Sequence, residues 1–227
     1  MFIVSTPIGN LQDVTQRALD TLKSADLIVC EDTRVTGNLL HHFEIKKEMV
    51  SMNDANEDQR VYEVIEKLQS GINIALVSDS GTPLISDPGF RLVRECVKKG
   101  IQVIPIPGAN AITTALSASG LPTDKFLFMG FCPDSFEHKK KFFLNIKNTL
   151  TFSAEQNIKP TVLFFESPHK LLKSLEAFLE VFGDIEIVAA REMTKIHEEF
   201  LKDTASNLLA HFTKNPPKGE FVILFHP

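Results

Sequence analysis

The sequence predicts an α/β protein of two domains, the first with a mostly parallel sheet and the second with a mixed sheet. Short apolar, β-branched runs alternate with helical patterns up to about residue 118, as in βαβ units. Beyond a Gly- and Pro-containing break, apolar runs follow one another more directly, which favours a mixed sheet. The 227 residues, 43% hydrophobic and 23% charged, suffice for two ordinary cores.

Five apolar runs are the predicted strands of the first domain. They read FIVST (2–6), DLIVC (26–30), INIALVS (72–78) and IQVIPI (101–106), with MVSM (49–52) a weaker fifth. A predicted helix between them carries Val61, Val64, Ile65 and Leu68 as an i, i+3, i+4, i+7 stripe. Asp87 and Pro88 are typical of a helix start, with Asp as the N-cap and Pro in the first turn.

The break at SASGLPTDKF (117–126) sets the predicted boundary, with domains over residues 1–118 and 119–227. The second domain has predicted strands at FLFMGF (126–131), TVLFFES (161–167), IEIVAARE (185–192) and EFVILF (220–225). A predicted helix from Pro168 to about Phe182 carries one apolar side, and Ser167 is its expected cap.

Composition excludes several classes of protein. The formal net charge of −5 argues against a generally basic nucleic-acid binder, so any RNA contact has to be local. The three cysteines match neither a disulfide framework nor a zinc site, and no other set of residues has metal-ligand spacing, so no metal is expected. No apolar run is long enough to span a membrane and the N-terminus lacks a signal-peptide pattern, which predicts a cytoplasmic protein with no membrane partner.

Five loops of unusual chemistry follow predicted strands. They read STPIGN, CEDTR, SDSGTPLISDPG and IPGANA in the first domain, and FFESPHK in the second. Ligands of open α/β sheets bind beyond the carboxyl ends of strands, and clefts between domains are another favoured place. Because neither GxGxxG nor a P-loop occurs, dinucleotide and nucleoside triphosphate chemistry are disfavoured. Gly- and Pro-rich loops with exposed amides suit a ligand that has a carboxylate, a flat ring and hydroxyls.

The motifs EDTR (31–34), SDSGTPLISDPG (78–89) and ASGLPTD (118–124) recur in the order seen in a known family. Together with FFESPHK, AREMTK and KGEFVI, they make the chain resemble the small-subunit ribosomal RNA methyltransferases of the tetrapyrrole methylase superfamily, nearly end to end. The resemblance implies two α/β domains with S-adenosylmethionine in the cleft between them, and a homodimer. It also implies methylation of the ribose 2′-hydroxyl of a decoding-centre cytidine in 16S rRNA, within the assembled subunit.

The resemblance also implies which residues bind the cofactor, with backbone groups doing much of the holding. By position in the motifs these are Ile8, Gly9, Ser78, Asp79, Ser80, Gly81, Pro83, Asn110, Ala111, Glu166 and Met193. Asp79 or Asp87 offers a carboxylate to polar ribose or amino groups of the cofactor, although Asp87 is also explained as a helix cap.

Methyl transfer to a ribose hydroxyl needs a base, or hydrogen bonds to the developing alkoxide. Our hypothesis is that Asp32 or Glu166 orients or deprotonates the hydroxyl, while Arg34 and Lys195 hold phosphate or stabilise charge. The alternative is that EDTR and AREMTK contain ordinary surface ion pairs, Glu31 with Arg34 and Glu192 with Lys195. His169 is a further candidate at a helix start, where packing is the simpler explanation.

Phosphate contacts from RNA require Lys and Arg, and HKKKFF (138–143) is the densest basic cluster. Three consecutive lysines on a helix are, however, more often a solvated face. Asn53, Ala55 and Met129 differ from the residues common in the resembled family, which bears on RNA recognition more than on the cofactor.

Two alternative functions remain. One is a methyltransferase of the same superfamily that acts on a tetrapyrrole or a modified protein residue. The other is a non-catalytic module that binds a small ligand.

Overall fold

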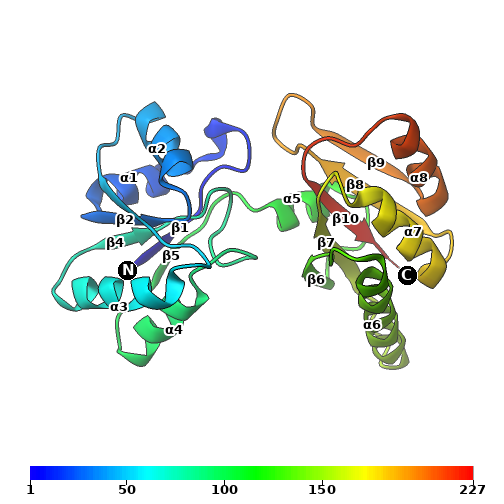
Figure 1. Cartoon of the computed structure of the whole chain (residues 1–227), viewed down its shortest axis with the longest axis horizontal. Helices are drawn as coiled ribbons and strands as arrows, with labels where there is room; N and C mark the ends of the chain where they lie inside the picture. Colours follow the sequence, from blue (N-terminus) through cyan, green and yellow to red (C-terminus); the bar gives the residue numbers. More distant parts are fainter. Residues whose placement is uncertain (227) are drawn as a thin grey trace. The chain divides into compact units, whose positions relative to one another are not determined.

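The computed structural model describes residues 1–226 and divides the chain into two compact units (Figure 1). The first unit is Met1–Asn110 and the second begins at Ala111. This division precedes helix α5 (Ala111–Ala118), whereas the boundary drawn from the sequence follows it. The physical reason is that α5 packs against strand β10 (Phe221–Phe225) of the second unit.

The first unit is a five-stranded sheet with helices between its strands (Figure 1). All of its strand pairs are parallel, and their order is β3-β2-β4-β1-β5, which confirms the predicted parallel sheet. The elements are β1 Phe2–Val4, a 3-10 turn Leu11–Asp13, α1 Gln16–Ser24, β2 Leu27–Cys30, α2 Thr33–His42, β3 Glu48–Ser51, α3 Glu57–Gln69, β4 Ile74–Leu76, α4 Phe90–Lys98 and β5 Ile104–Ile106.

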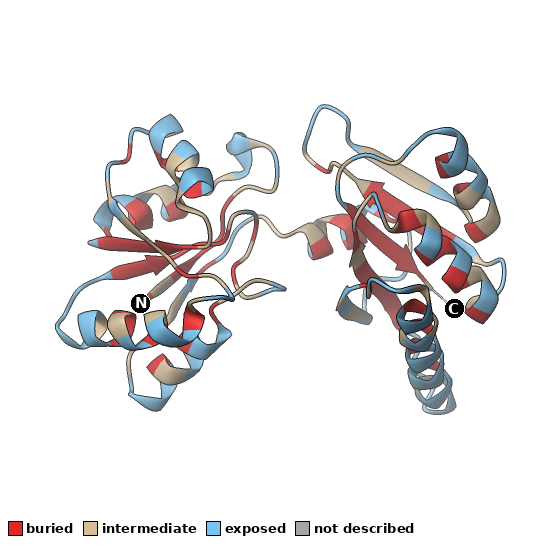
Figure 2. Cartoon of the chain, in the orientation of Figure 1, coloured by how far each residue is buried: buried red, intermediate tan, exposed pale blue. Residues whose placement is uncertain are grey.

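Helices cover both faces of this sheet because its central strands are apolar on both sides. Strand β2 is buried throughout, and alternate residues enter different cores. Leu27 and Val29 pack with α3 and α4, whereas Ile28 and Cys30 pack with α1 and α2. The buried strands between two half-exposed helical layers are visible in Figure 2. Residues beyond the strand ends are therefore the part of the sheet left for a ligand.

The strand order reverses between β2 and β4. The chain leaves β2 for β3 at one edge, and it leaves β4 for β5 at the other edge. At such a reversal the loops that follow the two strands diverge, which leaves a crevice at their carboxyl ends. The motifs CEDTR and SDSGTPLISDPG follow these two strands.

Asp87 is not the N-cap of α4, so that prediction was wrong. The cap position is Gly89, with a φ of 120° and no side chain to accept a hydrogen bond. The buried Glu57 of α3 replaces the missing cap, since its Oε1 accepts hydrogen bonds from the backbone N–H groups of Gly89 (3.0 Å) and Arg91 (3.3 Å). The α4 terminus is thus satisfied from a distant element, which leaves Asp87 available for another role.

The second unit has a five-stranded mixed sheet of order β6-β7-β10-β8-β9. Strands β6 and β7 are parallel and the other neighbours are antiparallel, which confirms the predicted mixed sheet. After α5, the elements are β6 Phe126–Phe131, α6 Phe136–Glu155, β7 Thr161–Glu166, α7 Leu171–Phe182, β8 Glu186–Arg191, β9 Glu199–Thr204, α8 Ala205–Lys214 and β10.

One large core joins three helices to one face of this sheet. Phe143 of α6 lies at its centre, with ring centroids 5.5 Å from those of both Phe164 and Phe178. Leu208 and Phe212 of α8 extend the same core. The aromatic packing fixes α6 and α7 against the sheet, and their N-termini thereby lie near the end of β7.

Two details of the second unit differ from the sequence prediction. Helix α7 begins at Leu171, with Lys170 at the cap position and no side-chain cap, so Ser167 does not cap it. Ser167 and Pro168 instead belong to a turn that leaves β7. Strand β9 was not predicted, because its residues are only partly buried at the sheet edge and carry no apolar run. Within residues 1–226, no helix is long and apolar enough to cross a membrane.

Candidate active site

The loops after β1 and β4 are joined by backbone hydrogen bonds. The N–H of Thr6 donates to the carbonyl of Gly81 (2.8 Å), and the N–H of Gly81 donates back to Thr6 (3.1 Å). The Thr6 hydroxyl also donates to the Ser78 carbonyl (3.3 Å). A Cβ on Gly81 would lie 3.1 Å from Cγ2 of Ile8. Three predicted cofactor residues, Ile8, Ser78 and Gly81, therefore come together at one sheet edge.

The loop after β5 joins the same cluster. The hydroxyl of Thr82 donates to the carbonyl of Ala109 (3.1 Å) and shares a hydrogen bond with the Ser5 hydroxyl (3.1 Å). Asn110 ends this loop, so three of the four predicted loops of the first unit meet. Gly9 and Ser80 are exposed on the loops, and Pro83 is buried beneath them. This strand-end cluster, residues 5–10, 78–83 and 108–110, is held mainly by backbone and hydroxyl groups.

The CEDTR loop is tied to the strand-end cluster through Asp79. The backbone N–H of Asp32 donates to Oδ1 of Asp79 (3.0 Å), and this bond bridges the loops that follow β2 and β4. The predicted residues Asp32 and Asp79 therefore lie together at the carboxyl ends of β2 and β4, where the strand order reverses. Neither the spacing nor the residue types of the sequence reveal this particular bond.

Asp32 is committed to its own helix and to Arg34. Its carboxylate caps α2 by accepting from the Arg34 N–H (2.8 Å) and forms an ion pair with the guanidinium (2.5 Å). These hydrogen bonds from Arg34 lower the pKa of Asp32 to about 2. The side chain of Arg34 is 87% exposed, so its guanidinium stays accessible from solvent although Nη2 is paired with Asp32. The ion pair in this motif is Asp32 with Arg34 rather than Glu31 with Arg34.

Three neighbouring acids have pKa values that are raised, in contrast to Asp32. Burial raises the pKa of Glu31, and the charges of Asp79 and Asp87 add to this rise. Burial also raises the pKa of Asp79, and that of Asp87 to about 6. An acid with a raised pKa is a better proton acceptor than Asp32, and it also favours a bound cation. The motif by itself predicts for Glu31 only an ion pair with Arg34, since burial cannot be read from the sequence.

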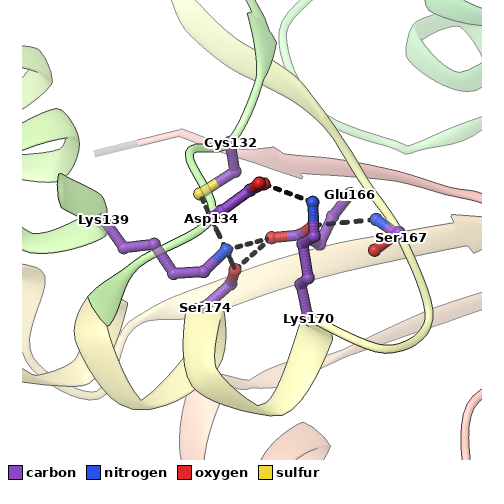
Figure 3. Close-up of polar contacts among 7 residues, drawn as sticks. All are labelled: Cys132, Asp134, Lys139, Glu166, Ser167, Lys170 and Ser174. Atoms are coloured by element: carbon purple, nitrogen blue, oxygen red, sulfur yellow. Dashed lines mark hydrogen bonds and ion pairs between the residues drawn. The ribbon is translucent and has the colours of Figure 1, made fainter.

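In the second unit, Glu166 is almost fully buried at the end of β7 (Figure 3). Its Oε2 accepts from the ammonium of Lys139 (2.7 Å) and from the hydroxyl of Ser174. Its Oε1 accepts from the backbone N–H of Ser167 (2.8 Å). With both oxygens engaged inside the unit, the side chain of Glu166 is not presented to a substrate hydroxyl.

The AREMTK loop lies at the same edge of the second sheet. Glu166 and Arg191 are both register partners of Phe221 in β10, so β7 and β8 end side by side across that strand. Met193 is buried just beyond β8. Lys195 forms an ion pair with Glu192 (2.9 Å) and keeps 41% of its side chain exposed.

The backbone of this loop has an unusual conformation. Glu192 and Thr194 adopt φ angles of 49° and 69°, which non-glycine residues rarely do. Gly219 is required beside them, since a Cβ there would lie 2.3 Å from Oε1 of Glu192. Strained residues of this kind persist where the surrounding structure holds them, and they cluster at functional sites.

The basic cluster at 138–143 does not form a continuous cationic surface. Lys139 is fully buried in the ion pair with Glu166. Lys140 pairs with Glu180 of α7 (2.7 Å), and Lys141 is exposed. The helical period separates three consecutive lysines onto different sides of α6. Within residues 1–226, no group of three His, Cys, Asp or Glu side chains is arranged to hold a metal ion.

Comparison with known proteins identifies the family. The family profile described as Tetrapyrrole (Corrin/Porphyrin) Methylases matches residues 1–209. The chain belongs to the tetrapyrrole methylase family. Solved structures of this fold include diphthine synthase, with a TM-score of 0.76 and 17% identity over 99% of this chain and 88% of that one. Uroporphyrin-III-C-methyltransferase from Thermus thermophilus has a TM-score of 0.64 and 18% identity, over 98% and 92% of the two chains.

Within the tetrapyrrole methylases, curated relatives at 43–48% identity are called ribosomal RNA small subunit methyltransferase I. That of Thermotoga maritima is 44% identical, over 99% of this chain and 96% of its own length. That of Haemophilus influenzae is 48% identical, over 99% and 77%. That of Bacillus subtilis is 43% identical, over 99% and 74%. The resemblance inferred from the motifs is confirmed, and the chain is a methyltransferase.

Proposed function

We propose that the chain transfers a methyl group from S-adenosylmethionine to the ribose 2′-hydroxyl of a decoding-centre cytidine in 16S rRNA. The identity with relatives named as small-subunit methyltransferases supports this substrate. The observation that carries the proposal is the strand-end cluster, in which three loops are joined by backbone and hydroxyl hydrogen bonds beside a carboxylate bridge to the CEDTR motif.

The residues of the first unit fit this cofactor. S-adenosylmethionine carries a sulfonium and an ammonium, and three acids of the strand-end loops, Glu31, Asp79 and Asp87, have pKa values raised by burial, with the charge of Asp79 adding to the rise at Glu31 and Asp87. A bound cation would relieve that repulsion. Gly9 is exposed and has no side chain, so a ring or ribose can approach its backbone closely. When bound, the cofactor supplies an electrophilic methyl carbon, whose bond to sulfur breaks as a bond to the ribose oxygen forms.

The protein has to orient the hydroxyl and take up its proton. We assign proton acceptance to the acids with a raised pKa, Glu31 and Asp79, in preference to Asp32. Asp32 acts by holding Arg34, whose exposed guanidinium is suited to a phosphate of the RNA. Lys195 is a second proposed phosphate ligand, held by Glu192.

For Glu166 we propose a cofactor contact through the backbone at the end of β7, because its carboxylate is occupied. Met193 is proposed to contact the cofactor in the same manner, through the backbone beside its buried side chain. Ala111 is the first residue of α5 and belongs to the motif IPGANA. We propose that it contacts the cofactor, as the resemblance implies.

Methyl transfer to purified small subunits tests the assignment of the two cations. Arg34→Ala and Lys195→Ala are expected to lower kcat/KM for the subunits by roughly 10- to 100-fold, because each removes a phosphate contact that positions the ribose. Affinity for the cofactor should be unchanged. The matched control is Lys98→Ala, which removes an exposed cation paired with Glu95. Lys98 lies in the last turn of α4, whereas the loop that follows β4 joins the first turn of this helix. Undiminished transfer by both variants would remove the assignment.

The substrate itself is tested by mapping ribose methylation in the small-subunit RNA of a strain that lacks this protein. Loss of one cytidine 2′-O-methyl group is expected, and an unchanged map would rule out the proposed reaction. Transfer to assembled subunits but not to free 16S rRNA would support the assembled particle as partner. The homodimer stays a prediction, which sedimentation of the purified chain can test.

A further inference from the structure

The buried ion pair of the second unit crosses three elements that are far apart in the sequence (Figure 3). Lys139 lies in the first turn of α6, Glu166 ends β7, and Ser174 lies in the first turn of α7. The side chains of the two charged residues are 0% and 1% exposed. Taking two charges out of water is so costly that a buried pair is weak evidence for stability, and conformational specificity is an alternative reason to keep one.

Every donor of the buried ammonium has an acceptor. Nζ of Lys139 donates to Oε2 of Glu166 (2.7 Å), Oγ of Ser174 (2.6 Å) and Sγ of Cys132 (3.6 Å). The pKa of the Cys132 thiol is raised to about 11 by burial, so the sulfur is uncharged and does not compete with Glu166 for the ammonium. The position of Lys139 therefore determines where the carboxylate of Glu166 lies.

The carboxylate of Glu166 in turn holds the backbone. Its Oε2 accepts hydrogen bonds from Lys139 and Ser174. Its Oε1 accepts one from the backbone N–H of Ser167, the first residue after the strand. The direction in which the chain leaves β7 is thus tied to the buried charge. On the outer side of the same turn, Lys170 forms an ion pair with Asp134 of the β6–α6 loop. Between these two anchors, residues 167–170 carry His169 on the exposed surface.

We propose that Lys139 is a positioning residue for methyl transfer, which acts through Glu166 to hold the turn 167–170 in the conformation needed by the cofactor and the RNA. This inference rests on the proposed function, in which the end of β7 contacts the cofactor. Lys139 touches neither reactant. Its effect is to keep a strand end and an exposed turn in one arrangement before the reactants bind, which lowers the cost of aligning them.

The test removes both buried charges together. In Lys139→Met with Glu166→Gln, no unpaired charge stays in the core, so the double variant is expected to fold, as judged by circular dichroism and urea unfolding. We expect amide hydrogen exchange in residues 167–170 to accelerate about tenfold, since the Ser167 N–H loses a charged acceptor. We also expect kcat to fall roughly 10- to 100-fold while KM for the subunits changes little.

The matched control removes a surface pair between the same two helices. Lys140→Met with Glu180→Gln eliminates the half-exposed ion pair of α6 and α7, one residue away from Lys139. Neither exchange in the turn nor kcat should change. Ser174→Ala retains both charges and loses one hydrogen bond to Glu166, so it should shift both measurements in the same direction by about threefold. This variant decides the question if the double variant does not fold.

The two measurements separate the possible failures. A folded variant with unchanged exchange in residues 167–170, or with accelerated exchange and an unchanged kcat, overturns the role of Lys139. Absence of methyl transfer by the wild-type chain overturns the proposed function instead, while the exchange measurement still reports whether Lys139 holds the turn.

Discussion

Asp32 and Asp87 are both acids of strand-end motifs, yet their surroundings give them opposite properties. Arg34 lowers the pKa of Asp32 to about 2 by donating hydrogen bonds to its carboxylate. Burial raises the pKa of Asp87 to about 6, and the negative charge of Asp79 adds to the rise. The residue type predicts a carboxylate in each place, but only the neighbours decide which one accepts a proton near neutral pH.

Asp87→Asn is predicted to stabilise the protein at neutral pH. A group whose pKa is raised by folding contributes stability fully below the pKa of the unfolded chain, about 4, and loses it as pH rises through the folded pKa. The contribution of Asp87 should therefore disappear between about pH 4 and pH 6. At pH 7.5 we expect the variant's free energy of unfolding to exceed the wild-type value by roughly 1 kcal/mol, after allowance for partial solvent screening.

Urea unfolding at pH 4.5 and pH 7.5 measures this difference. Asp58→Asn is the control, because Asp58 is an exposed acid whose pKa is lowered by Arg91, and its loss should not stabilise the chain at pH 7.5. An Asp87→Asn variant whose stability equals that of the wild type at both pH values would contradict the burial of this carboxyl.

The loop between β4 and α4 has an unusual backbone. Gly81, Leu84, Ser86 and Gly89 all have positive φ angles, of 83°, 76°, 69° and 120°. Leu84 and Ser86 are strained, since side chains with a Cβ rarely adopt this conformation. The sequence SDSGTPLISDPG shows where glycine is needed, but it gives no sign that two other residues share the conformation. Such strain is consistent with a loop shaped for a ligand.

Ser86→Gly is predicted to stabilise the loop. Relief of the strained φ outweighs the larger backbone entropy of glycine in the unfolded chain, for a net gain of about 0.5 kcal/mol. The control is Ser70→Gly, since Ser70 is an exposed serine with a φ of −79° and should lose stability instead. Thermal unfolding of both variants gives the signs, and equal signs would argue against strain at Ser86.

Gly89→Ala is predicted to destabilise the first unit by about 2 kcal/mol or more. Its Cβ would lie 2.9 Å from Cδ2 of Leu76 and 3.2 Å from Cδ2 of Leu84, at a φ of 120°. The substitution also displaces the N–H that Glu57 accepts. Gly100→Ala, where φ is 69° but nothing lies within 4 Å of the new Cβ, separates the clash from backbone strain. Equal losses for the two variants would contradict the close packing at Gly89.

The secondary structure was predicted well where the sequence has a clear apolar run or an apolar helical stripe. Nine of the ten strands within residues 1–226 were found from apolar runs, and β9 was missed because it lies at an edge, is only partly buried and carries no apolar run. Helix α7 was found, but its start was placed too early because Ser167 and Pro168 imitate a cap. Local signals of this kind give the possible starts of a helix, and tertiary hydrogen bonds choose among them.

As a whole, the chain carries a net charge of −5 and must still approach an anionic RNA. Half of its 24 lysine and arginine side chains form ion pairs, as at Arg34 with Asp32 and Lys195 with Glu192. Such pairs leave exposed donors without a strong long-range field, so recognition relies on short-range contacts and on the shape of the subunit.

S-adenosylmethionine is predicted to stabilise the folded chain by mass action. At a concentration 100 times its Kd, the free energy of unfolding should rise by about 2.7 kcal/mol. Differential scanning fluorimetry with S-adenosylmethionine and with S-adenosylhomocysteine measures the effect. ATP, which shares the adenosine but adds a triphosphate to an acidic cluster, is the control and should give no shift. A shift with ATP alone would contradict the proposed cofactor.

The sequence alone established the α/β class, the two sheets, the family motifs and the loops that carry them, because apolar periodicity and ordered motifs are local properties of the chain. Only the tertiary structure showed that Lys139 is buried, that the carboxylate of Glu166 is paired with it, and that the carboxylate of Asp32 is paired with Arg34. Each of these depends on a partner that is distant in sequence or on removal from water. Burial and hydrogen-bond partners set the charge, the reach and the pKa of a side chain, and no residue type specifies them.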